Sequence, residues 1–105
     1  MPFVLLVKCG PESDIIPLNQ PLSCVGRSRR ACDYALDHPA VSRVHLIVRL
    51  VGTRIFVVDN NTRNGTLVNG EQLTSERELV DGDVIEICGT FLEFHADDFT
   101  EHEPR

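Results

Sequence analysis

Apolar and polar residues alternate along most of this chain, in short segments that are separated by turn-forming residues. The longest alternating segment is residues 44–51. Its even-numbered positions, from Val44 to Leu50, predict one face of a strand, and the odd-numbered positions, from His45 to Val51, predict the other. A period of two residues is typical of strands. The pattern therefore predicts a β-rich fold.

Short segments of this kind recur between clusters of glycine, proline, asparagine and aspartate. Strands are predicted at residues 3–9, 15–18, 22–25, 34–36, 44–51, 54–59, 66–69, 84–88 and 90–95. A dense turn signal covers residues 10–14, and only residues 71–80 have a composition compatible with a helix. About ten short strands with regular turns predict an antiparallel β-sandwich.

The chain has 105 residues, which suits one domain with one core. We expect this domain to cover residues 1–95, and the acidic, unpatterned residues 96–105 to be a tail or the start of a linker. The longest apolar run, residues 3–7, is far too short to span a membrane, and the first residues lack the features of a signal peptide. An intracellular protein without membrane contact is the expectation.

The four cysteines are scattered and form no Cys-x-x-Cys pair, which favours small buried thiols over disulfides. A zinc site was weighed because two histidines follow two of the cysteines. Cys24, Cys32, His38 and His45 are separated by seven, five and six residues, unlike the close ligand pairs that hold zinc. The sequence therefore predicts neither a metal nor a cofactor.

Charge is distributed unevenly along the chain. Residues 26–66 hold seven arginines and three aspartates, a balance of +4, while the rest of the chain carries −10, and the two sum to the net charge of −6. An acidic protein is a poor general nucleic-acid binder, so no direct nucleic-acid contact is expected. A local group of arginines favours a compact site for phosphate or carboxylate, because the guanidinium fork donates two parallel hydrogen bonds.

Three motifs lie at the ends of predicted strands. They are Gly26-Arg27, Ser42-Arg43-Val44-His45 and Asn64-Gly65-Thr66-Leu67-Val68-Asn69-Gly70. Taken singly, each is compatible with an ordinary turn or a surface side chain. Together, and with the flanking text Cys32-Asp33-Tyr34-Ala35-Leu36 and Asp81-Gly82-Asp83-Val84-Ile85, they resemble the forkhead-associated (FHA) domain over residues 3–94.

The resemblance implies an all-β sandwich of eleven strands with its binding loops at one end. It also implies that the domain binds a phosphothreonine-containing segment of a partner protein. By motif position, Arg27 and Ser42 are expected to contact the phosphate, and Asn64 the peptide backbone. Gly26, His45 and Gly65 are expected to support the site structurally, and Asn69 to fix the loop that presents Asn64.

Arg43 and Arg63 occupy loop positions that flank the expected phosphate site. Members of the family often carry serine or threonine where this chain has Arg63. We interpret Arg63 as a further ligand contact, with a solvent-facing side chain as the alternative. A phosphothreonine offers nearly two negative charges and three acceptor oxygens, which an arginine fork and a serine hydroxyl are suited to bind.

Two other classes of function were weighed. A hydrolase using Ser42 and His45 is disfavoured, because residues three apart on an extended chain point to opposite faces, so no catalytic residue is predicted. A phosphate-independent interaction or dimerisation scaffold stays open, and with it a homodimer. The resemblance, together with the early start of the domain, further predicts an N-terminal module of a nuclear DNA-damage mediator or checkpoint protein.

Overall fold

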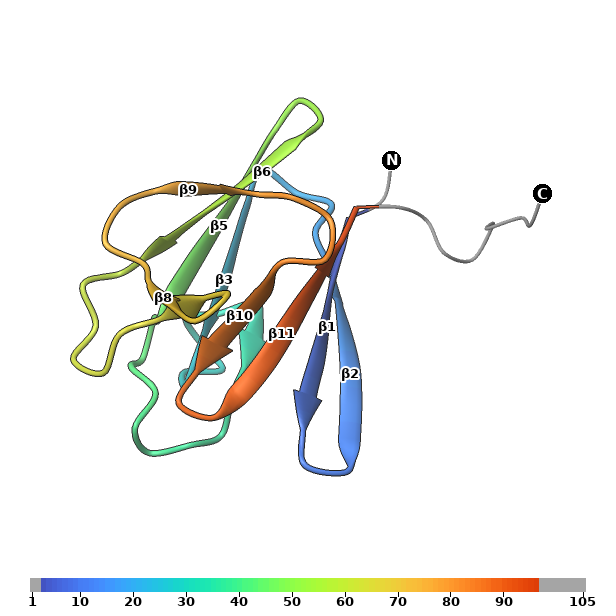
Figure 1. The fold of residues 1–105 in the computed structure, drawn as a ribbon. Coiled ribbons are helices and arrows are strands. Elements are labelled where there is room, and N and C mark those ends of the chain that lie inside the picture. Colours follow the sequence, from blue (N-terminus) through green and yellow to red (C-terminus); the bar gives the residue numbers. More distant parts are fainter. Residues whose placement is uncertain (1–2, 97–105) are drawn as a thin grey trace.

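The computed structural model describes residues 3–96, which form two β-sheets packed face to face (Figure 1). Eleven strands make up the fold: β1 (Val4–Cys9), β2 (Glu12–Pro17), β3 (Leu22–Gly26), β4 (Tyr34–Ala35), β5 (Leu46–Val51), β6 (Arg54–Asp59), β7 (Leu67–Val68), β8 (Glu71–Gln72), β9 (Arg77–Leu79), β10 (Val84–Ile87) and β11 (Thr90–His95). The predicted all-β sandwich is confirmed. The predicted tail lies outside the described residues, apart from Ala96.

One sheet has the strand order β2-β1-β11-β10-β7-β8, and the other has the order β4-β3-β5-β6-β9. Neighbouring strands run antiparallel with one exception, since the short strand β4 pairs with β3 in parallel. The core lies between the sheets, where alternate positions of the strands β1, β5, β6, β10 and β11 are buried. Its largest fully buried side chains include Leu5, Leu46, Ile55, Leu92 and Phe94.

Two predicted elements differ in the structure. Strand β2 begins at Glu12, although residues 10–14 were expected to form a turn. Only Gly10 and Pro11 make the turn, and Glu12 pairs with Cys9. As an edge strand, β2 exposes its first four residues and so needs no apolar alternation there. Residues 71–80 form β8 and β9 with a loop between them, so the expectation of a possible helix was wrong.

The long alternating segment also begins later than expected, at Leu46. His45 is fully buried beside the equally buried Leu46, so the alternation fails at this point. The alternation predicts His45 and Leu46 on opposite faces, whereas the structure buries both side chains. The main chain bends before β5, and His45 there accepts a hydrogen bond from Asn60 N at its carbonyl oxygen (3.0 Å).

Sheet order brings four loop regions to the same end of the sandwich. They are residues 27–33 after β3, residues 36–45 before β5, residues 60–66 between β6 and β7, and the turn between β10 and β11. In Figure 1 the turn between β5 and β6 marks the opposite end. Among the described residues, no helix is long and apolar enough to cross a membrane.

Gly26 lies where β3 meets the loop before β5, and the backbones there are too close for any side chain. A Cβ atom added at Gly26 would overlap the carbonyl oxygen of Arg43 and lie 2.9 Å from the amide nitrogen of His45. Both neighbours are main-chain atoms that other hydrogen bonds hold in place. The expected structural role of Gly26 therefore has a steric basis.

We predict that Gly26→Ala lowers the free energy of unfolding by about 1–3 kcal/mol, the usual cost of overpacking. Thermal unfolding followed by circular dichroism measures this change. Gly10→Ala is the comparison, because an added Cβ there meets no atom within 4 Å and only the positive φ of +63° disfavours alanine, so it should lower the free energy of unfolding less than Gly26→Ala does. Equal melting temperatures for Gly26→Ala and the unmodified chain would contradict the steric argument.

Candidate functional site

The site is built around the imidazole of His45, which joins two loops. Its Nδ1 atom accepts a hydrogen bond from the amide of Ser42 (3.1 Å), and its Nε2 atom lies 2.9 Å from the carbonyl oxygen of Gly65. Acceptance at Nδ1 requires that the proton of a neutral ring be on Nε2, which donates to Gly65. The ring thus fastens the loop of residues 36–45 to the loop of residues 60–66.

This geometry bears on the hydrolase alternative. The chain between Ser42 and His45 bends and is not extended, so the premise that these residues cannot meet was wrong. What reaches the ring is the backbone amide of Ser42, not its hydroxyl. Because that amide occupies Nδ1 and Gly65 occupies Nε2, the ring has no nitrogen left to take a proton from Ser42.

Three consecutive residues of the loop before β5 receive hydrogen bonds from the other two motifs. Asn64 Nδ2 donates to the carbonyl oxygen of Ala40 (2.8 Å), and Arg27 Nη1 donates to that of Val41 (2.8 Å). The backbone amide of Arg27 donates to the carbonyl oxygen of Ser42 (2.9 Å). The sequence-predicted residues Arg27, Ser42 and Asn64 are therefore brought together.

Arg27, which the resemblance assigns only to the phosphate, also has a structural part. Its guanidinium holds the Val41 carbonyl and so helps to shape the loop that carries Ser42. The remaining guanidinium nitrogens are not engaged by any residue in the range 3–96. Arg27 can therefore hold the loop and still present donors to an anion.

Several exposed arginines near these loops have no partner. Within residues 3–96, the side chains of Arg29, Arg30, Arg43 and Arg63 make no hydrogen bond or ion pair. By contrast, Arg49 and Arg54 are paired with Glu76 and Glu78. Arg43 and Arg63, which were predicted to flank the site, are thus among the arginines left free to bind an external anion.

Asp59 organises the loop of residues 60–66 and was missed by the sequence reasoning. Its carboxylate accepts hydrogen bonds from the amide (2.9 Å) and hydroxyl (2.7 Å) of Thr62 and from the hydroxyl of Thr66 (2.7 Å). Thr62 Oγ1 in turn accepts from the amide of Gly65 (3.0 Å). The spacing Asp59-x-x-Thr62 at a strand end is a turn signal that could have identified it.

Gly65 lies at a position that only glycine suits. Its backbone has φ of +79°, which favours glycine, and a Cβ there would lie 2.9 Å from Nε2 of Gln72. Asn69 has a different role from the one expected. It bonds to Asp83 (2.9 Å) and to the amide of Val84 (2.9 Å), and so fixes the turn after β7 to the start of β10 instead of the loop that presents Asn64.

A surface pocket of about 380 Å³ lies beside Asn64. It is lined by His38, Ala40, Asn64, Gly65, Leu67, Glu86 and Cys88. The described residues contain no group of three or more His, Cys, Asp or Glu side chains that could hold a metal ion. The arrangement therefore offers amide, hydroxyl and guanidinium donors around an open surface, next to a pocket that can receive a side chain.

All four cysteines are free, in keeping with the preference for thiols over disulfides. Their expected burial was wrong, because Cys9 is exposed and Cys24, Cys32 and Cys88 are only partly buried. Small side chains near loop ends stay accessible where no second layer of structure covers them.

Comparison with known proteins places this geometry in context. A family model described as FHA domain matches residues 24–88. The glycogen accumulation regulator GarA of Mycolicibacterium smegmatis is 40% identical over 85 residues, which are 80% of this chain and 52% of that protein. A protein phosphatase 1 regulatory inhibitor subunit PPP1R8 homologue of Arabidopsis thaliana is 39% identical over 72 residues, 68% of this chain and 20% of that protein.

Among solved structures, one from a study of phosphothreonine-dependent FHA domain interactions superposes with a TM-score of 0.82 at 28% identity. The likeness covers 90% of this chain and 96% of that one. The curated relatives are longer, and the chain spans about half of the first and a fifth of the second.

We predict that His45→Ala lowers the melting temperature by several degrees or more. The substitution leaves the Ser42 amide and the Gly65 carbonyl without partners, at about 1–3 kcal/mol for each buried group, and each kcal/mol shifts the midpoint by about 4–8 °C in a domain of this size. His45→Asn keeps an acceptor near the position of Nδ1 and should recover part of the loss. An unchanged melting temperature for His45→Ala would refute the bridging role.

A second prediction concerns acid. Burial alone raises the pKa of the Asp59 carboxyl, but hydrogen bonds from Thr62 and Thr66 outweigh burial and lower the pKa below its usual value. A carboxyl whose pKa is lower in the folded state stabilises the fold above its unfolded pKa of about 3.9, and that contribution disappears as the pH falls through the folded pKa.

Melting temperatures measured from pH 6 to pH 2 should therefore fall less steeply below about pH 4 in Asp59→Asn than in the unmodified chain. The variant should also melt lower at neutral pH. Asp37→Asn, at an exposed position, serves as the control and should keep the original slope. Parallel curves for all three proteins would show that Asp59 makes no such contribution.

Proposed function

Because the chain belongs to the FHA family, we propose that it is a binding module for phosphothreonine-containing segments of partner proteins. The observation that carries this proposal is the convergence of Arg27, Ser42 and Asn64 on one three-residue stretch of the loop before β5. The solved relative from work on phosphothreonine-dependent FHA interactions supports the choice of ligand.

In this proposal Arg27 and Ser42 bind the phosphate. Arg27 keeps its bond to Val41 and offers its other guanidinium nitrogens, and the hydroxyl of Ser42 has no partner among residues 3–96. Each hydrogen bond to a charged group contributes about 1.5–3 kcal/mol net. Two or three such bonds separate a phosphorylated from an unmodified segment by well over a hundredfold.

Asn64 binds the backbone of the segment, and Arg43 and Arg63 flank the phosphate. The Asn64 side chain donates one hydrogen to Ala40, which leaves its second amide hydrogen and its carbonyl oxygen for a peptide amide and carbonyl. Arg63 is exposed and unpaired within residues 3–96, which supports its interpretation as a ligand contact. The pocket beside Asn64 receives a side chain that flanks the phosphothreonine.

The regulator-type relatives support a non-enzymatic module that acts by binding. One relative is a bacterial glycogen accumulation regulator, and the other is a homologue of a protein phosphatase 1 regulatory inhibitor subunit. Neither supports the prediction of a DNA-damage mediator or checkpoint protein. A nuclear location and a DNA-damage role therefore stay predictions from the sequence. The same holds for self-association, which sedimentation equilibrium of the purified chain would test.

We predict that a phosphothreonine peptide binds and that its unphosphorylated form does not. A Thr→Glu form should bind poorly, because a planar carboxylate with one charge replaces a near-dianion with three oxygens. Fluorescence anisotropy titrations of the three forms measure these differences. Comparable affinities for the phosphorylated and unmodified forms would overturn the proposed function.

Titration of two arginine variants with the phosphothreonine peptide tests whether Arg63 contacts the ligand. Arg63→Ala should weaken binding by about tenfold or more through loss of a charged contact, and leave the melting temperature unchanged because the side chain has no partner within residues 3–96. Arg54→Ala removes the same charge from an arginine bound to Glu78 and is the matched control. If both variants bind alike, Arg63 makes no ligand contact.

A further inference from the structure

Two cysteine thiols face each other at the base of the loop that follows Arg27. Cys24 lies in β3, Cys32 comes two residues before β4, and their Sγ atoms are 2.7 Å apart. This separation is less than 1 Å longer than a covalent S–S bond of about 2.05 Å. Among the described residues no other two thiols are in such contact.

The backbone holds the two cysteines in a position suited to a covalent bond. Strands β3 and β4 are direct neighbours, and the amide of Asp33 donates to the carbonyl oxygen of Cys24 (2.9 Å). The Asp33 carboxylate accepts from the amide of Cys24 (2.8 Å). These bonds hold the residue next to Cys32 against Cys24, and the two thiols reach each other across the start of the β3–β4 pair.

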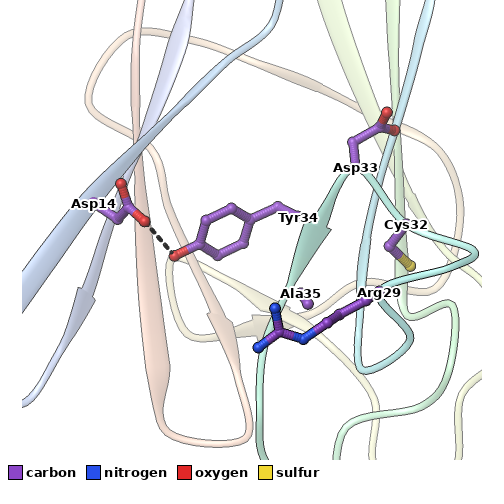
Figure 2. A pocket seen from close by; sticks show the side chains of 6 residues that line it. All are labelled: Asp14, Arg29, Cys32, Asp33, Tyr34 and Ala35. Carbon is purple, nitrogen blue, oxygen red and sulfur yellow. Dashed lines mark hydrogen bonds between the residues drawn. The ribbon is translucent and has the colours of Figure 1, made fainter.

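Cys32 is also accessible from the surface. It lines an open pocket of about 420 Å³ together with Asp14, Arg29, Asp33, Tyr34 and Ala35 (Figure 2). One side of this pocket is fixed by the hydroxyl of Tyr34, which donates to Asp14 (3.0 Å). A small oxidant can therefore reach the Cys32 sulfur without unfolding the domain.

The same thiol touches the loop before β5. Cys32 Sγ lies 3.2 Å from the carbonyl oxygen of Arg43, which also accepts from the amide of Ser28 (3.2 Å). The amide of Cys32 donates to the carbonyl oxygen of Ser28 (3.0 Å) and so closes the turn that contains Arg29 and Arg30. Oxidation of Cys32 would therefore change contacts of the loop that carries Arg29 and Arg30.

We propose that Cys24 and Cys32 are a site of reversible oxidation, whose disulfide fastens the loop of residues 27–33 to β3. With hydrogen peroxide as oxidant, the Cys32 thiol releases its proton, its sulfur attacks one peroxide oxygen, and the O–O bond breaks; the departing hydroxide takes up that proton, which leaves a sulfenic acid and water. The Cys24 sulfur then attacks Cys32 Sγ, the S–O bond breaks, and a second water leaves with the Cys24 proton.

Oxidised glutathione can serve in place of peroxide. Cys32 displaces one glutathione to form a mixed disulfide, and Cys24 displaces the second, so that two thiols are oxidised and one disulfide is reduced. A dithiol reductant reverses the reaction. Burial, followed by the contact with Cys32, raises the pKa of Cys24 to about 12, so Cys24 stays protonated at neutral pH and the first attack falls to Cys32.

The unmodified chain provides a direct test by peptide mapping. After treatment with oxidised glutathione and blocking of free thiols, trypsin and a glutamate-specific protease separate Cys9 from Cys24, because cleavage occurs at Lys8, Glu12 and Arg27. We expect residues 13–27 to be linked to residues 31–43, and dithiothreitol to release them. Recovery of both peptides with blocked thiols, or of Cys32 still joined to glutathione, would overturn the proposal.

Thermal unfolding gives a second, independent measurement. The disulfide closes a loop of nine residues from Cys24 to Cys32, which should raise the melting temperature by about 10 °C in the oxidised form. Cys9→Ser should keep this gain, since Cys9 is remote from the pair in sequence and lies on β1, whereas Cys32→Ser should lose it. An equal gain in Cys32→Ser, or none in the unmodified chain, would contradict the assignment.

Discussion

One neutral, fully buried imidazole decides the shape of the binding end. The ring of His45 takes a hydrogen bond from the Ser42 amide and gives one to the Gly65 carbonyl, and these groups belong to the two loops that extend beyond the paired strands β5 and β6. Both loop groups are main-chain polar groups that would otherwise need water. The ring satisfies both groups at once, and it does so only in one tautomer and one orientation.

The other features of the site follow from this link. Because His45 turns inward, β5 starts late and the chain before it passes close to β3, which is why Gly26 can carry no side chain. The bent loop presents the carbonyl groups of Ala40, Val41 and Ser42 in succession, and Asn64 and Arg27 bind to them. Loop shape is therefore set by hydrogen bonds, and the flanking arginines need not contribute to it.

The sequence predicted the sandwich because a period of two residues survives wherever a strand has one buried face. The prediction failed for strands without a regular buried face. These are the edge strand β2, whose first half is exposed, and the short strands β8 and β9. Motif positions singled out Arg27, Ser42, His45, Gly65 and Asn64, which the structure brings to one end of the sandwich. They misplaced Asn69, whose partners Asp83 and Val84 are distant in sequence and are brought near only by the pairing of β7 with β10.

Two chemically different side chains contact the backbone of the loop before β5. His45 holds the Ser42 amide through a ring that oxidants of thiols do not change, while Cys32 contacts the neighbouring Arg43 carbonyl through a thiol that they do. Formation of a disulfide removes the thiol hydrogen from Arg43 but leaves that carbonyl bonded to the Ser28 amide. The fold of the site therefore does not depend on the redox state of the cysteines, whereas the freedom of the arginine-bearing loop does. Oxidation can stiffen one side of the binding end without unfolding it. The His45 ring binds the amide of Ser42, whereas the Cys32 thiol contacts the carbonyl group of the next residue, Arg43.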